Sequence, residues 1–180
     1  MPPTATRVRM AWGRRPILVL LAVAAAALAA VVWLRRAPPL PSLAAPAAEV
    51  RVVDGDSLAF GERRVRLLGL DAPERAQDCR DGDREVPCGR LAREALERLV
   101  RGTGRVTCAV HGEDRFRRAL GVCATEDGVE INRSLVREGW ALAWRDDPTY
   151  AEEERRAARE RRGIHAWEFV PPGEWRRGQR

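Results

Sequence analysis

Apolar and polar positions along the chain predict short strands interleaved with three helices. Apolar residues mark one strand between Val52 and Phe60 and another between Val65 and Leu70, and the Gly61-Glu62 step between them is typical of a turn. Further strands are expected at 105–110, 116–124 and 140–144, and helical spacing predicts helices at 89–101, 130–138 and 149–162. About five short strands with three helices indicate an α+β domain.

One segment near the start of the chain is apolar throughout. The run from Ile17 to Leu34 is 18 residues long, without charge and flanked by Arg on both sides. This length is at the lower edge of what spans a bilayer and exceeds a usual signal-peptide core. We expect residues 1–36 to be an uncleaved signal anchor in the membrane, with the domain on the extracytoplasmic side, because more Arg precede the run than follow it. The alternatives are a cleaved signal, which would leave the domain secreted or periplasmic, and a buried soluble helix.

Composition divides the remaining chain into three parts. Residues 37–48 contain four Pro and predict a semi-extended linker, 49–168 predict the folded domain, and 169–180 predict a C-terminal tail. All 32 basic residues are Arg, and six of them precede residue 49 in a segment without acids, which leaves 26 basic and 26 acidic residues after it. The folded part is formally neutral, so the basic isoelectric point does not indicate nucleic-acid binding.

Four cysteines lie in the part expected to be exported: Cys79, Cys88, Cys108 and Cys123. An even number in an exported domain favours disulfides, and the spacings do not fit a zinc site. Pairing the nearest neighbours predicts Cys79–Cys88, which closes a small loop, and Cys108–Cys123, which bridges two expected strands. Four buried free thiols are the alternative.

Candidate chemistry is concentrated between Val53 and Glu74, where Asp56, Asp71 and Glu74 stand close to Arg66 in the expected hairpin. A hairpin would bring Asp56 and Asp71 to the same end of the paired strands. Two carboxylates without a lysine to neutralise them favour a hard divalent cation such as Ca²⁺, and an adjacent guanidinium favours a phosphate ligand. The same residue types are also common in solvated turns.

Three segments together resemble the thermonuclease (staphylococcal-nuclease-like) family. They are the hairpin with Asp-Gly-Asp-Ser, Arg-Leu-Leu and Asp-Ala-Pro-Glu, the Asp-Arg-Phe-Arg-Arg-Ala-Leu segment at 114–120, and the Asn-Arg-Ser-Leu-Val-Arg-Glu-Gly-Trp-Ala segment at 132–141. The resemblance covers about residues 50–167, and the cysteines and the closing segment 169–175 resemble an exported bacterial branch. It implies a five-stranded OB-type β-barrel with three helices, here preceded by one N-terminal hydrophobic helix.

The resemblance also implies roles for individual residues. Asp56 and Asp71 would bind Ca²⁺ through their carboxylates and Ala72 through its carbonyl oxygen. Glu74 would orient or deprotonate the attacking water, and Arg66 and Arg118 would clamp the phosphate and stabilise the transition state. The expected function is a Ca²⁺-dependent endonuclease, a phosphodiesterase that hydrolyses DNA and RNA outside the cytoplasm.

The chain departs from the family pattern beside Arg118. Arg115 and Phe116 match the substrate-binding part of that segment, but Phe116 replaces a Tyr whose hydroxyl contacts phosphate, and Arg117 replaces a Gly. If that position requires a positive φ, Arg117 costs about 1 kcal/mol or more. On a strand, Arg117 would point away from Arg118.

Other readings of the chain stay open. A catalytically silent OB module that binds nucleic acid or a protein partner at the envelope is the alternative function, although no catalytic position of the pattern is lost. We expect a monomer, and no protein partner is identifiable from the sequence. The isolated His111 and His165 are weak catalytic candidates, and Trp140, Trp144 and Trp167 are expected to pack in the core.

Overall fold

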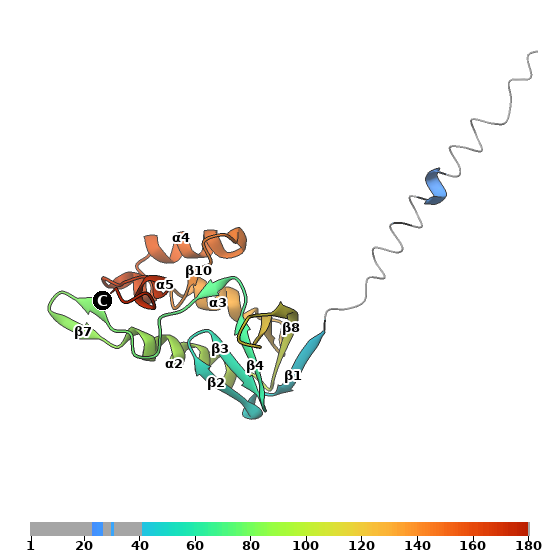
Figure 1. Cartoon of the computed structure of the whole chain (residues 1–180), viewed down its shortest axis with the longest axis horizontal. Helices are drawn as coiled ribbons and strands as arrows, with labels where there is room; N and C mark the ends of the chain where they lie inside the picture. Colours follow the sequence, from blue (N-terminus) through green and yellow to red (C-terminus); the bar gives the residue numbers. More distant parts are fainter. Residues whose placement is uncertain (1–22, 27–29, 31–40, 180) are drawn as a thin grey trace, which may run out of the picture. The chain divides into compact units, whose positions relative to one another are not determined.

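The alternating apolar segments form a sheet of six strands (Figure 1). In spatial order these are β1 (Ser42–Pro46), β8 (Arg105–Glu113), β9 (Ala119–Thr125), β4 (Arg63–Leu67), β3 (Ser57–Phe60) and β2 (Val50–Asp54). Only β4 and β9 pair in parallel. A flat sheet would hold β1 and β2 about 24 Å apart, at five spacings of about 4.8 Å. The 3-10 turn η1 (Ala47–Glu49) that joins them is too short for that span, so the sheet curls.

The computed structural model describes residues 23–26, 30 and 41–179. Residues 23–26 and 30 are helical, and the residues from 41 onward belong to one unit, which contains all the elements discussed below. Within these described ranges, no helix has the length and apolar character needed to cross a bilayer. The signal anchor at 1–36 falls almost entirely outside them and stays a prediction.

The first strand of the sheet lies where the sequence predicts a linker. Residues 42–46 pair in antiparallel register with β8, Ser42 opposite Ala109 and Pro46 opposite Arg105. Within the stretch predicted as a linker, residues 42–46 are therefore part of the sheet, which has six strands instead of five. An Ala- and Pro-containing segment can occupy this place because an edge strand needs only one hydrogen-bonded neighbour.

Two small strand pairs extend the sheet. Strand β5 (Leu70–Asp71) pairs with β10 (Leu142–Ala143), and β6 (Cys79–Asp81) forms a hairpin with β7 (Arg84–Val86). Both predicted disulfides are confirmed: Cys79–Cys88 ties this hairpin to the following helix, and Cys108–Cys123 joins directly opposed residues of β8 and β9.

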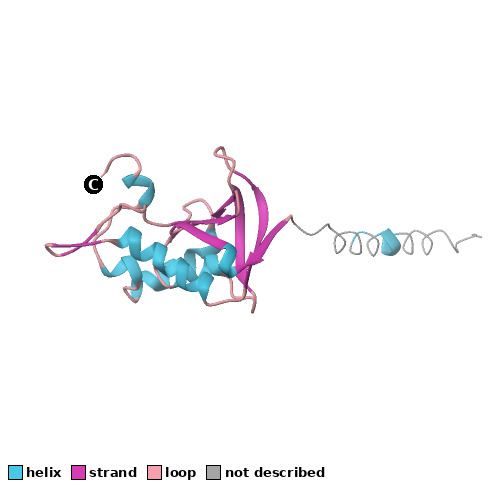
Figure 2. Cartoon of the chain, turned by 90° about the horizontal axis from the view of Figure 1, so that it is seen from below, coloured by secondary structure: helices cyan, strands magenta, loops and turns pink. Residues whose placement is uncertain are grey.

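The helices gather on one side of the curved sheet (Figure 2). The three expected helices are α2 (Cys88–Arg101), α3 (Ile131–Arg137) and α4 (Ala151–Arg159), the last preceded by the 3-10 turn η2 (Pro148–Tyr150). Two further elements were not predicted from the sequence: the 3-10 turn η3 (Gly163–Ala166) and the short helix α5 (Pro172–Trp175). Helix α5 lies in the range predicted to be a tail.

Two apolar clusters hold these elements together. The larger cluster joins the inner face of the sheet to α2 and α3, with Leu58, Leu96 and Leu135 fully buried. The smaller one, called the disulfide cluster below, contains Cys79, Cys88 and Ile164, with Val86, Trp140, Leu142, Trp167 and Phe169 packed against them. The disulfide cluster thus attaches the C-terminal segment to the β6–β7 hairpin.

Candidate active site

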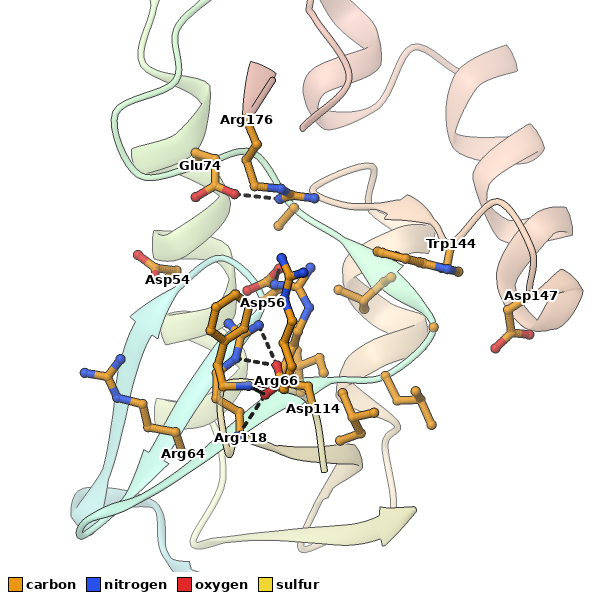
Figure 3. Close-up of a pocket in the computed structure, with 18 of the residues that line it drawn as sticks. Asp54, Asp56, Arg64, Arg66, Glu74, Asp114, Arg118, Trp144, Asp147 and Arg176 are labelled. Carbon is orange, nitrogen blue, oxygen red and sulfur yellow. Dashed lines mark hydrogen bonds and ion pairs between the residues drawn. The ribbon is translucent and has the colours of Figure 1, made fainter. Parts of the chain in front are cut away.

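Arg66 joins the carboxylate of Asp56, in the turn after β2, to that of Asp71, the last residue of β5. The chain reverses at 54–56 between β2 and β3, and register places Ser57 opposite Arg66. Arg66 Nη1 lies 2.9 Å from Asp56 Oδ2, and Arg66 Nη2 lies 2.6 Å from Asp71 Oδ1. One guanidinium therefore holds both predicted metal ligands close to each other. Figure 3 shows Arg66 and Asp56 in the cleft.

The Asp56 carboxylate is buried, with 8% of its side chain exposed. Burial raises the pKa of the Asp56 carboxyl, while the Arg66 guanidinium and the Ser57 hydroxyl, which donates to Oδ1 at 2.8 Å, lower it in part. Such a carboxylate is costly to keep charged without a cation nearby, and the structure supplies one in Arg66.

Glu74 stands on a tight loop that packs against the start of α2. The Gln77 backbone N–H donates to the Glu74 carbonyl at 2.8 Å, and the Gly89 N–H donates to the Gln77 carbonyl at 2.9 Å. A Cβ added to Gly89 would lie 1.8 Å from the Glu74 carbonyl oxygen. Only glycine permits this approach, because it has no side chain. The close contact between Gly89 and the Glu74 backbone therefore fixes the position of the Glu74 loop.

Arg118 is held by a turn that Asp114 organises. Asp114 Oδ1 accepts the backbone N–H groups of Phe116 and Arg118 at 2.9 and 3.0 Å, and Oδ2 accepts Arg118 Nε at 2.8 Å and Nη2 at 2.7 Å. Burial alone would raise the pKa of Asp114, but these hydrogen bonds hold it below its usual value. Asp114 was not predicted to have a role in the site, although an Asp at the first position of a turn is a recognisable signal.

The same turn corrects the predicted strand at 116–124. Strand β8 extends to Glu113 and β9 begins at Ala119, so the residues between them form the turn. Arg117 has a φ of 63°, the left-handed conformation that the replaced glycine would adopt without strain. The strand on which the opposite orientation of Arg117 and Arg118 was expected is therefore wrong at these two residues. Arg117 is nevertheless absent from the cleft lining, whereas Arg118 is part of it.

Aromatic and basic side chains form the rim of the site. Phe116 is 64% exposed, and the guanidinium carbons of Arg115 and Arg118 lie 4.7 and 5.5 Å from its ring centre. Trp144, expected in the core, is 45% exposed and lines the cleft, whereas Trp140 and Trp167 pack together in the disulfide cluster. The rim therefore presents two exposed rings, Phe116 and Trp144.

A third arginine reaches the carboxylates from the C-terminal segment. Arg176 Nη2 contacts Asp71 Oδ2 at 2.8 Å, and Arg176 Nη1 contacts Asp71 Oδ1 at 3.1 Å. Arg176 Nη1 also contacts Glu74 Oε1 at 2.6 Å (Figure 3). Arg176 was not predicted from the sequence, because no local pattern links position 176 to positions about 100 residues earlier.

These residues surround one open cleft of about 980 Å³. It is lined by Asp54, Asp56, Arg64, Arg66, Leu67, Leu68, Gly69, Leu70, Ala72, Pro73, Glu74, Asp114, Arg115, Phe116, Arg118, Leu120, Trp144, Asp147 and Arg176. Every predicted catalytic and substrate-binding residue belongs to this lining, and Asp71 is attached to it through Arg66 and Arg176. Neither histidine contributes.

The predicted cation ligands are the carboxylates of Asp56 and Asp71 and the backbone carbonyl of Ala72, and their role stays a prediction. In the described ranges, no cluster of three or more His, Cys, Asp or Glu side chains is arranged to hold a metal ion. Asp56 and Asp71 are two carboxylates that already share one cation, Arg66. A hard divalent ion can be held by two carboxylates if carbonyl oxygens and water complete its ligand shell.

Comparison with known proteins places this cleft in context. The sequence model of the family described as "Staphylococcal nuclease homologue" matches residues 64–168. An "Uncharacterized endonuclease" of Escherichia coli O157:H7 is 33% identical over 137 residues, which cover 71% of this chain and 82% of the relative.

Two other relatives are longer than the shared region. The "Succinoglycan biosynthesis protein ExoI" of Rhizobium meliloti is 34% identical over 95 residues, covering 52% of this chain and half of ExoI. The "Probable staphylococcal-like nuclease CAN1" of rice, Oryza sativa, is 33% identical over 130 residues, covering 70% of this chain and 36% of the relative.

Proposed function

The chain belongs to the family of staphylococcal nuclease homologues, and we propose that it is an endonuclease that hydrolyses the phosphodiester bonds of DNA and RNA with Ca²⁺ outside the cytoplasm. The observation that carries the proposal is the convergence of Arg66, Glu74 and Arg118 on one cleft beside two shared carboxylates. No single short motif accounts for that arrangement, because Arg66 and Glu74 belong to the 53–74 segment and Arg118 comes from a second segment about 45 residues later.

The two arginines are suited to bind a phosphate that becomes more negative as it reacts. A guanidinium carries five N–H donors, and the contacts of Arg66 with Asp56 and Asp71 use two of them. Arg118 uses its Nε and Nη2 on Asp114, which fixes the direction of the remaining donors. Held in this way, both groups can donate to a phosphate without reorganising. Such preorganised donors are usually the largest contribution to transition-state stabilisation in sites of this kind.

Glu74 is the candidate general base, the group that accepts the proton of the attacking water. Its carboxylate lines the cleft and its backbone is fixed by the contacts with Gln77 and Gly89. A carboxylate held beside the phosphate can orient a water molecule and accept its proton. Asp56, Asp71 and the Ala72 carbonyl would hold Ca²⁺, which supplies Lewis acidity when bound.

The rim supports a substrate with unpaired bases. Exposed rings stack on bases of any sequence, and neighbouring arginines attract the phosphate backbone. Phe116 and Trp144 provide the rings, and Arg64 and Arg115 provide charge on the cleft wall. Single-stranded DNA and RNA are therefore the substrates expected to be cleaved most readily.

The two disulfides support a location outside the cytoplasm, where they form and persist. The predicted anchor at 1–36 agrees with that location. We infer that the domain faces the extracytoplasmic side of a membrane or is released there.

A nuclease assay tests the proposal. The purified full-length chain should degrade single-stranded DNA and RNA in Ca²⁺ and lose this activity in a chelator. A Glu74→Gln variant purified in the same way should be at least about 100-fold slower, which excludes a contaminating nuclease. Equal hydrolysis in chelator would contradict the metal requirement. Binding of nucleic acid without hydrolysis would favour the silent module instead.

A further inference from the structure

Arg176 makes three contacts with the two carboxylates that the proposed function needs most. Both oxygens of Asp71 and one oxygen of Glu74 lie within 3.1 Å of its terminal nitrogens. These hydrogen bonds, led by those of Asp71, raise the pKa of the Arg176 guanidinium. Its side chain is 37% exposed and that of Asp71 is 11% exposed, so Arg176 is the more solvent-accessible partner of this pair.

The surrounding structure fixes this position. The backbone of Glu168 pairs with Arg80 of the β6–β7 hairpin in both directions, at 2.8 and 2.9 Å. The Gln77 side chain donates to the Val170 carbonyl at 2.6 Å, and Arg145 contacts Glu174 of α5 at 3.0 Å. Together with the disulfide cluster, these contacts hold Arg176 beside the carboxylates of Asp71 and Glu74.

A metal cation bound by Asp71 would lie next to the positively charged Arg176 guanidinium. Ca²⁺ lies 2.3–2.6 Å from its oxygen ligands. Asp71 Oδ1 already accepts from Arg66 at 2.6 Å and from Arg176 at 3.1 Å, and Oδ2 accepts from Arg176 at 2.8 Å. A divalent ion on either oxygen would stand next to the Arg176 guanidinium and be repelled by it.

We propose that Arg176 is an internal competitor of the metal: it occupies Asp71 and Glu74 until a divalent cation displaces it, and so sets the cation concentration that the site requires. The inference rests on the proposed function for the identity of the metal ligands. It assigns a role to the C-terminal segment, which supplies none of the groups expected to act on the phosphate. Displacement of Arg176 would also free Glu74 to receive the water molecule.

The test compares Arg176→Gln with Arg177→Gln in the full-length chain. Both remove one positive charge from the same segment, but Arg177 is exposed and is absent from the cleft lining. Calorimetric titration with Ca²⁺ should show a dissociation constant about tenfold lower for Arg176→Gln than for wild type, a change expected from removing one adjacent like charge. Arg177→Gln should shift it less than about threefold, because Arg177, unlike Arg176, forms no ion pair with Asp71 or Glu74 in the described residues.

Thermal unfolding provides a second measurement. In chelator, Arg176→Gln should have a lower melting temperature than wild type, because Asp71 and Glu74 lose their contacts with Arg176. The increase in melting temperature on adding Ca²⁺ should be larger for this variant. Equal Ca²⁺ affinities of Arg176→Gln and wild type, or binding by neither, would overturn the inference even if the chain hydrolyses DNA. Tighter Ca²⁺ binding by Arg176→Gln would sustain it even if hydrolysis were absent and the proposed function failed.

Discussion

Replacing Gly89 by Ala tests whether the Glu74 loop is positioned by close packing. The new Cβ would stand 1.8 Å from the Glu74 carbonyl oxygen and 2.8 Å from its carbonyl carbon. Ordinary contact begins at 3.4 Å, so one backbone must retreat by about 1.6 Å. Neither backbone moves freely, because the Gly89 N–H is bonded to Gln77 and Cys88 is tied to Cys79.

Two physical effects predict opposite signs for this change. Helix propensity alone would make Ala at residue 89 more stable by up to about 1 kcal/mol. Overpacking costs typically about 1–3 kcal/mol, so we expect a net loss of stability. A displacement of about 1 Å near the reacting groups can lower a rate about 100-fold. We therefore expect kcat to fall by about two orders of magnitude at temperatures where the variant stays folded.

The assay is steady-state hydrolysis of single-stranded DNA in saturating Ca²⁺, together with thermal unfolding. Gly112→Ala is the matched control, because its Cβ would meet nothing within 4 Å and its φ is not positive. The control should keep kcat within about twofold, consistent with a surface change far from the packing described above. A Gly89→Ala variant as active and as stable as wild type would refute the idea that this approach fixes Glu74.

Two further predictions concern the arginines. Arg66→Lys and Arg118→Lys should each lower kcat about 100-fold or more while the chain stays folded, because lysine keeps the charge but lacks the planar guanidinium that directs two hydrogen bonds. Arg117→Lys is the control. An equal loss of kcat in Arg117→Lys would show that the phosphate clamp has been assigned to the wrong residue. Arg117→Gly should raise the free energy of unfolding by up to about 1 kcal/mol in a thermal or urea titration, because the strain at φ of 63° exceeds the entropy cost of glycine. A clear loss of stability would contradict the positive φ.

The part of the site that sequence predicted depends on short-range geometry. Asp56, Arg66 and Asp71 lie within 16 residues of one another, and the turn signals and the strand alternation between them determine which side chains meet. The confirmed disulfides follow the same rule, since each closes a local loop or joins neighbouring strands. Helix α2 was predicted within one residue because its apolar stripe and Gly102 mark both its face and its end.

The parts that sequence reasoning missed depend on tertiary contacts or on single side chains. Arg176 meets Asp71 across 105 residues, a pairing that no local period can show. The turn before Arg118 interrupts an apolar pattern that looks continuous, because one Asp114 carboxylate binds the backbone there. Strand β1 has little β-propensity of its own and is extended because β8 offers it an open edge.

Strand β1 also limits how far the protein can be truncated from its N-terminus. A chain that starts at residue 49, where the sequence places the domain boundary, would keep every predicted site residue. It would nevertheless leave β8 with unpaired N–H and C=O groups along the stretch from Arg105 to Ala109. An open edge of that kind recruits strands from other molecules. Loss of residues 42–46 would therefore first appear as self-association in solution, before any change in the chemistry of the cleft.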